Sequence, residues 1–193
     1  MSLARLPQTL CLLLAAACAC AAQTPQTLEP DDYLTRLEAA LETRGSVLIK
    51  GSTPVGSVTG LRGTASVTSW EIVDARTAVR VYGLSVAIRD NERPENEEVA
   101  YVDYEEIDPL VAGLDYILKL ENTATKLARF EAQYRTRGEL SFYRFNTPNG
   151  YGTAVSVRER RGPRLVLRPA GLVEFRDLLD SAKALIDDAR HKP

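Results

Sequence analysis

The sequence predicts an α+β protein with two antiparallel β-meanders (about four strands each), each followed by an amphipathic helix, and preceded by a short N-terminal helix. Between residues 46 and 103 apolar and polar residues alternate, and the period then changes from that of a strand to that of a helix. The same order returns between residues 126 and 190. A sheet with one apolar face needs a cover, which a helix with one apolar stripe provides. We therefore expect a single α+β domain over residues 30–193, with pseudo-repeated halves at 46–121 and 126–190.

The short N-terminal helix is expected to open at Pro30-Asp31-Asp32, because an aspartate can accept hydrogen bonds from the free N–H groups of a first turn. Gly45 is expected to end it. Residues 46–63 contain four glycines between apolar residues, which predicts one or two short strands with turns. The apolar stripe of the helix comprises Leu34, Leu37 and Leu41.

Longer strands are expected at 65–73 and 78–89, and a shorter one at 99–103. The alternation of the second strand shifts at Gly83, which predicts a bulge there. A helix should follow, with Asp108 as its N-cap, Pro109 as its first residue and Asn122 as its stop. Its apolar stripe comprises Ile107, Leu110, Val111, Leu114, Ile117 and Leu118.

The second half predicts strands at 128–134 and 140–145, separated by a turn at Arg137-Gly138. Asn149-Gly150 predicts a hairpin, because both residues tolerate a positive φ. Two further strands should meet across Gly162-Pro163, and the chain closes with a long amphipathic helix. These last elements are expected at 153–159, 165–167 and 172–186.

Residues 1–22 are expected to be an export signal rather than part of the fold. Arg5 gives the segment a positive start, Leu10 to Ala17 is a short apolar core, and Cys18 to Ala22 supplies the small residues that a signal peptidase requires. The apolar core is too short for a permanent membrane helix. Residues 23–29 follow as a polar linker.

Two kinds of processing fit this signal. Leu14-Ala15-Ala16-Ala17-Cys18 resembles a bacterial lipoprotein box, although its Leu lies four residues before the Cys, and lipidation of Cys18 would tether the chain to a membrane. Ordinary cleavage after Ala21 or Ala22 fits equally well, and it would remove all three cysteines. We therefore expect an exported protein, either periplasmic or anchored in the envelope as a lipoprotein, with secretion as the alternative.

The residue inventory excludes several chemistries. His191 is the only histidine and lies near the C-terminus, and no cysteine follows residue 20. Catalytic Ser–His and Cys–His pairs and Cys/His zinc sites therefore have no basis in the mature chain. The sequence also contains neither a P-loop nor a nucleophile elbow. We expect a protein that is not an enzyme and that holds no metal or cofactor.

Acidic residues crowd the junction between residues 92 and 108. They could form a calcium site or a general acid/base pair, but EF-hand spacing is absent. A solvated edge, together with acids that interact favourably with a helix N-terminus, explains them equally simply and is preferred. The cluster comprises Glu92, Glu95, Glu97, Glu98, Asp103, Glu105, Glu106 and Asp108.

One basic cluster spans the last expected hairpin, and it is the candidate binding site of the sequence. Arginines interleaved with apolar residues could share a sheet face and bind an anionic polymer such as lipopolysaccharide, teichoic acid or nucleic acid. The alternative is that they keep an edge hairpin soluble or pair with the protein's own acids. The cluster comprises Arg158, Arg160, Arg161, Arg164 and Arg168.

The repeated order of strands and helix resembles the Pur and Whirly families of single-strand nucleic-acid-binding proteins, which pair two ββββα units. The segment Pro169 to Leu179 is similar to the start of a Pur-repeat helix. The resemblance implies the fold and a sheet face that presents basic and aromatic residues to unstacked bases. The export signal and the formal net charge of −2 depart from that pattern, so we do not expect nucleic acid as the main partner.

These observations together predict an exported, non-enzymatic binding or structural domain of the bacterial cell envelope. Its partner would be an envelope protein or an anionic polymer, and it would meet the membrane only through a lipid anchor. A polyanion or single-strand nucleic-acid binder acting through the Arg158–Arg168 hairpin is the first alternative. A carboxylate-dependent hydrolase or calcium-binding module is the second.

Overall fold

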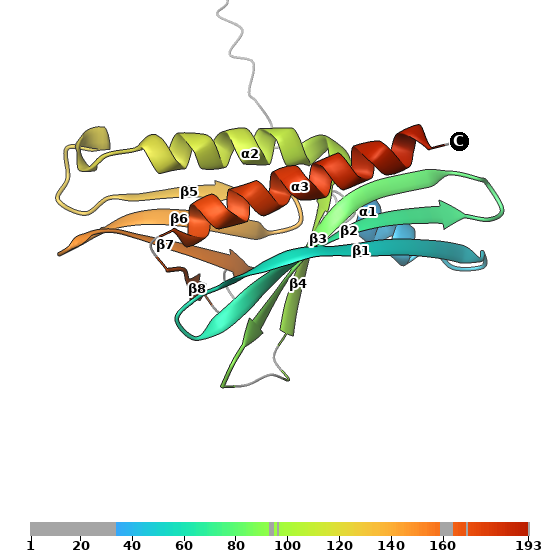
Figure 1. The fold of residues 1–193 in the computed structure, drawn as a ribbon, viewed down its shortest axis with the longest axis horizontal. Helices are drawn as coiled ribbons and strands as arrows, with labels where there is room; N and C mark the ends of the chain where they lie inside the picture. Colours follow the sequence, from blue (N-terminus) through green and yellow to red (C-terminus); the bar gives the residue numbers. More distant parts are fainter. Residues whose placement is uncertain (1–33, 93–94, 96, 159–163, 169, 193) are drawn as a thin grey trace, which may run out of the picture.

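The structure, a computed structural model, describes residues 34–92, 95, 97–158, 164–168 and 170–192. It confirms the predicted α+β class: two antiparallel four-stranded sheets, in the orders β1-β2-β3-β4 and β5-β6-β7-β8, are each followed by a helix (Figure 1). The elements are α1 (Arg36–Leu41), β1 (Leu48–Thr59), β2 (Gly63–Asp74), β3 (Arg80–Asp90), β4 (Glu97–Asp103), α2 (Tyr104–Lys119), the 3-10 turn η2 (Asn122–Ala124), β5 (Glu131–Arg135), β6 (Leu140–Thr147), β7 (Gly150–Val157), β8 (Arg164–Val166) and α3 (Gly171–His191).

The start of α1 was predicted wrongly, because Thr35 rather than an aspartate caps it. The Thr35 hydroxyl accepts a hydrogen bond from the Glu38 N–H, and the Glu38 carboxylate accepts one from the Thr35 N–H, which is a capping box. The helix ends at Leu41, and Gly45 occupies the following turn with a φ of +72°. Pro30 to Asp32 lie outside the described residues.

The bulge predicted at Gly83 is absent from the described pairing, which runs through that residue without a shift. Two apolar faces explain the broken alternation: Val81 lines a hollow beside α1, whereas Leu84 and Val86 belong to the main core. The register shift lies instead in β1, between Pro54 and Gly56, where the proline has no N–H to give to the ladder. The one or two short strands predicted over residues 46–63 are a single strand of 12 residues, β1.

The first residues of α2 were also misassigned. Asp103, in extended conformation, is the N-cap, and Pro109 lies inside the helix rather than at its start. A proline there costs one backbone hydrogen bond, which the burial of Ile107 and Leu110 outweighs. The helix ends at Lys119, before the predicted stop at Asn122.

The two turns predicted in the second half are present. β5 and β6 are joined through Arg137 and Gly138, and β6 and β7 form a hairpin with Thr147 opposite Gly150. Only Gly150 of the predicted Asn-Gly pair has a positive φ, +125°. The loop is therefore Pro148-Asn149, one residue earlier than the pattern suggested.

The two helices do not simply cover the sheets that precede them. α3 packs mainly on β1 and β2 of the first sheet, and the Ser69 hydroxyl donates a hydrogen bond of 3.1 Å to the Ala182 carbonyl. α2 packs on β5 and β6 as well as on β3 and β4, and Arg144 of β6 donates one of 2.7 Å to the Leu118 carbonyl. Figure 1 shows the helices side by side above both sheets. The last helix of the chain therefore covers the sheet that the first half of the chain forms.

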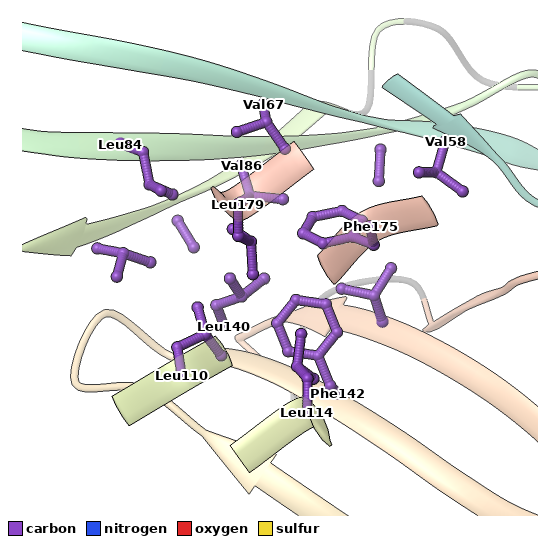
Figure 2. Packing of buried hydrophobic residues seen from close by; sticks show 14 of the residues in the cluster. Val58, Val67, Leu84, Val86, Leu110, Leu114, Leu140, Phe142, Phe175 and Leu179 are labelled. Carbon is purple, nitrogen blue, oxygen red and sulfur yellow. The ribbon is translucent and has the colours of Figure 1, made fainter. Parts of the chain in front are cut away.

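One apolar core runs through the molecule, with members from both sheets and both long helices. Figure 2 shows its side chains pointing toward one another from the two sides. At its centre the rings of Phe142 and Phe175 meet edge to face, with centroids 5.0 Å apart and planes at 64°. Both side chains are fully buried. The two halves of the chain therefore share a single interior.

The sheets meet at two places but remain separate within the described residues. Gly60, after β1, forms an isolated bridge with Leu167, and the Leu61 N–H donates a hydrogen bond of 2.9 Å to the Val166 carbonyl. At the other contact, Gly138 lies so close to the Tyr101 carbonyl oxygen that an added Cβ would be 2.0 Å from it. Among the described helices, none is both long and apolar enough to cross a bilayer.

Candidate anion-binding face

The structure describes three arginines of the predicted cluster, Arg158, Arg164 and Arg168, and their surroundings differ. Arg158 is exposed just after β7, with a φ of +48°, and Arg164 lies in β8 opposite Ser156. Arg168 is turned toward the first sheet, where its Nε donates a hydrogen bond of 3.1 Å to the Thr59 carbonyl. Arg160 and Arg161 lie outside the described residues.

Arg164 belongs to the outer face of the second sheet, which is the face opposite α2. Because side chains alternate along a strand, the core positions Phe142 and Val155 fix which residues point the other way. The pairing then aligns residues of all four strands on the outer face. This face comprises Glu131, Gln133, Arg135, Ser141, Tyr143, Phe145, Gly152, Ala154, Ser156, Arg164 and Val166.

Arg164 is held against two aromatic rings of this face. Its guanidinium carbon lies 3.7 Å from the centre of the Tyr143 ring and 5.3 Å from that of Phe145. The same guanidinium forms an ion pair of 2.8 Å with Glu131, and both partners are about half exposed. A guanidinium stacked on a ring keeps its N–H edge available in the plane of the group. The position of the charge is therefore fixed while part of it remains open to solvent.

A buried polar network fixes Tyr143 beneath that arginine. The Tyr143 hydroxyl lies 3.2 Å from the Ser156 hydroxyl, and it accepts a hydrogen bond of 3.1 Å from the Gln133 amide. The same amide donates one of 3.3 Å to the Ser141 hydroxyl. Tyr143 is 1% exposed, and both serines are buried. Satisfied buried networks of this kind restrict side-chain motion. The middle of the outer face is closed to solvent, so its accessible part is the edge at Arg164 and Glu131.

One end of the outer face opens into a hollow of about 700 Å³. Asn146 shapes its wall, because its side-chain oxygen accepts a hydrogen bond of 3.0 Å from the Phe130 N–H and its amide donates one of 2.8 Å to the Ala128 carbonyl. Both Arg129, which is exposed, and Arg164 line the hollow. Its other lining residues are Phe130, Glu131, Phe145, Asn146, Thr147 and Pro148.

Two segments of the chain carry opposite charge, a feature that the whole-chain charge conceals. Residues 126–168 contain ten Lys and Arg against three Asp and Glu, a net charge of +7. Residues 46–121, which hold the first sheet and α2, contain seven against thirteen, a net charge of −6, of which −2 falls on residues 46–103. The prediction from sequence relied on the total of −2 and missed this separation. Counting charge for each predicted half would have found it.

No protein-family model matches the chain, and no curated protein matches it in sequence. The architecture of two ββββα units, which the resemblance to Pur and Whirly proteins implied, is present in the structure.

Acidic residues of the junction between residues 92 and 108 form separate hydrogen bonds and ion pairs with the rest of the protein. Asp103 accepts hydrogen bonds from two N–H groups of α1, and one Glu106 oxygen accepts one of 2.8 Å from the Arg137 N–H. Three others form ion pairs: Glu97 with Arg89, Glu105 with Arg36, and Asp108 with Lys183. Within the described residues there is no group of three or more His, Cys, Asp or Glu that could hold a metal ion.

Proposed function

We propose that the protein is an exported, non-enzymatic domain of a bacterial cell envelope that binds an anionic polymer at the accessible edge of the outer face of its second sheet, where Arg164 lies. The charge separation along the chain carries this proposal: +7 over residues 126–168, which hold the second sheet, and −6 over residues 46–121, which hold the first sheet and α2. A field of that kind orients the molecule toward a polyanion and repels the polymer from the other half. Comparing the affinity for a polyphosphate with that for an oligothymidylate distinguishes an envelope polymer from a nucleic acid.

Arg164 and the hollow beside it support the proposal at the level of contacts. Guanidinium groups bind phosphate and carboxylate through two parallel hydrogen bonds, and this bidentate geometry requires a fixed guanidinium plane. Tyr143 and Phe145 supply that plane for Arg164, and Arg129 lines the same hollow. A polymer lying across the hollow would displace Glu131 from its exposed ion pair, which costs little.

Salt dependence of binding tests the proposal. Linear inorganic polyphosphate and a fluorescent oligothymidylate are titrated into the mature protein at several salt concentrations, because each neutralised phosphate lowers the logarithmic slope by about 0.7 for a single strand. Arg164→Gln should weaken binding and reduce the slope by about that amount. Arg89→Gln is the matched control, since it also removes an exposed strand arginine paired with a glutamate, but in the acidic sheet.

Binding without a salt slope, or equal losses in the two variants, would rule the proposal out. Similar affinities for the two polymers would indicate recognition of the anionic backbone alone. Much tighter binding of the oligothymidylate would instead favour the nucleic-acid alternative, because bases add stacking energy.

The export part of the proposal rests on residues 1–22, which lie outside the described residues. The intact mass of the protein from its own host tests it. A mass that fits a diacylated Cys18 would make the protein a lipoprotein, and an N-terminus at Ala22 or Gln23 would make it soluble after export. Full-length protein in the cytosol would contradict export.

A further inference from the structure

Two adjoining hollows lie at the end of the first sheet that is remote from the outer face of the second. The first, of about 290 Å³, is lined by arginines from three elements: Arg36 of α1, Arg80 of β3 and Arg190 of α3. The second, of about 400 Å³, runs beneath α1 along Ala40, Leu48 and Ile72. Arg36, Val79 and Val81 line both, so the two form one groove with a basic end and a largely apolar end.

The topology explains why this groove exists. β4 leaves the sheet at Asp103, which pairs with Gly83, so the first residues of β3 extend beyond the end of their neighbour. α1, the start of α2 and the end of α3 converge on that exposed strand, and Figure 1 shows α1 and the C-terminus at the same end of the sheet. Val79 remains 57% exposed there, although valine normally favours burial.

The basic end of the groove is only partly neutralised by the protein. Arg36 pairs with Glu105 in an exposed contact of 3.0 Å, and Arg80 pairs with Glu71. Arg190 makes no ion pair within the described part of the chain: its guanidinium carbon lies 4.0 Å from the centre of the Tyr104 ring and 5.7 Å from that of Tyr82.

Asp74, the acidic residue that lines the apolar end, is already hydrogen-bonded within the protein. The Asp74 carboxylate, which lines the apolar hollow, accepts hydrogen bonds from the Ser46 hydroxyl and from the N–H groups of Arg76 and Thr77. These bonds lower its pKa, so it stays ionised and repels an anion from that end. A ligand with one anionic end is therefore oriented with that end toward the three arginines.

We propose that this groove binds a small amphipathic anion, an aliphatic chain that ends in a carboxylate or a phosphate. Arg190, stacked on Tyr104, holds the anionic head together with Arg36 and Arg80, while Val79, Val81 and Leu48 cover the tail. Small-molecule sites usually occupy about 300–1,000 Å³, and they combine apolar walls with a few convergent polar groups. This site is separate from the outer face of the second sheet and does not depend on a polymer ligand.

Isothermal titration calorimetry with three ligands that share a ten-carbon chain tests the proposal: decanoate, decyl phosphate and decyltrimethylammonium. We expect one or both anions to bind and the cation not to bind, because only the head group differs. Octanoate should bind about fifteenfold more weakly than decanoate, since each buried methylene contributes about fourfold in affinity. Equal binding of the cation, or no binding of either anion, would overturn the proposal.

Two pairs of matched variants locate the site. Arg190→Gln should weaken anion binding about tenfold, whereas Arg44→Gln, which removes an exposed charge outside the groove, should leave it unchanged. Val79→Ser should weaken binding of the tail, whereas Val173→Ser, at a position 46% exposed on α3, should not. Because all four positions are exposed, folding is preserved; equal effects within either pair would overturn the assignment.

Discussion

Asp103 connects the end of β4 to the start of α1, and its replacement is the sharpest test of the packing described above. The residue is 5% exposed, and its carboxylate accepts hydrogen bonds of 2.9 Å from the Arg36 N–H and 3.0 Å from the Leu37 N–H. Thr35 serves the next donor, the N–H of Glu38. A helix of six residues is too short to be stable alone, so α1 depends on these contacts.

The magnitude follows from the number of bonds lost. Asp103→Asn keeps one accepting oxygen and faces the other N–H with an amide group that cannot accept. Hydrogen bonds to charged groups contribute about 1.5–3 kcal/mol each, so we expect a loss of about 2 kcal/mol for Asn and about 3–5 kcal/mol for Ala. For a domain of this size, 2 kcal/mol corresponds to a decrease in Tm of about 4–8 °C.

Urea unfolding followed by circular dichroism measures the loss, and hydrogen exchange at the Leu37 and Glu38 amides reports whether α1 loosens first. Glu105→Gln is the control, because its side chain is 65% exposed and should change stability by less than about 0.5 kcal/mol. Equal midpoints for the Asn variant and this control would refute the claim that Asp103 holds α1 in place.

Three further predictions concern the core, the contact between the sheets and the response to acid. Phe175→Ala should cost about 3–5 kcal/mol in urea unfolding, because the ring is fully buried against Phe142, and a smaller loss would contradict the shared core. Gly138→Ala should cost about 1–3 kcal/mol, since its Cβ would meet a carbonyl, whereas Gly51→Ala, with its nearest atom at 3.8 Å, should be tolerated. The pKa of Asp187 is lowered from 3.8 by hydrogen bonds from Tyr104 and Lys183, so its stabilising contribution is present above that pH and is lost as the pH falls below it. Tyr104→Phe should therefore lose less stability than the wild type between about pH 5 and about pH 2, and an unchanged pH dependence would contradict this.

The fold class could be predicted because local periodicity encodes it. The change from a two-residue to a 3.6-residue period before residue 107, and the long stripe from Leu172 to Ile186, both mark the helices that the structure contains. Turn residues placed the β5–β6 and β6–β7 connections within one residue. These features depend on neighbours in the sequence, which a single chain shows directly.

The features that sequence reasoning missed depend on distant partners. Asp103 accepts hydrogen bonds from the Arg36 and Leu37 N–H groups of α1, and Arg168 donates one to a carbonyl of the first sheet, although neither partner lies nearby in the chain. The same holds for the candidate sites: the sequence identified Arg164 as a candidate, but it could not show that this arginine stacks on Tyr143. Arg36 and Arg190 meet at one groove from opposite ends of the described chain. Only tertiary structure reveals such pairs.

The placement of α3 on β1 and β2 has a consequence for how the chain folds. β1 and β2 lack most of their apolar cover until the last helix, which begins more than 100 residues after β1, has been made. Contacts that span so much of the chain pay a large loop-closure entropy before they stabilise anything, so folding should be slow and cooperative. A nascent chain that ends before Gly171 would hold all eight described strands and yet lack the helix that covers the first sheet, so it should remain unfolded long enough for processes that require an unfolded polypeptide.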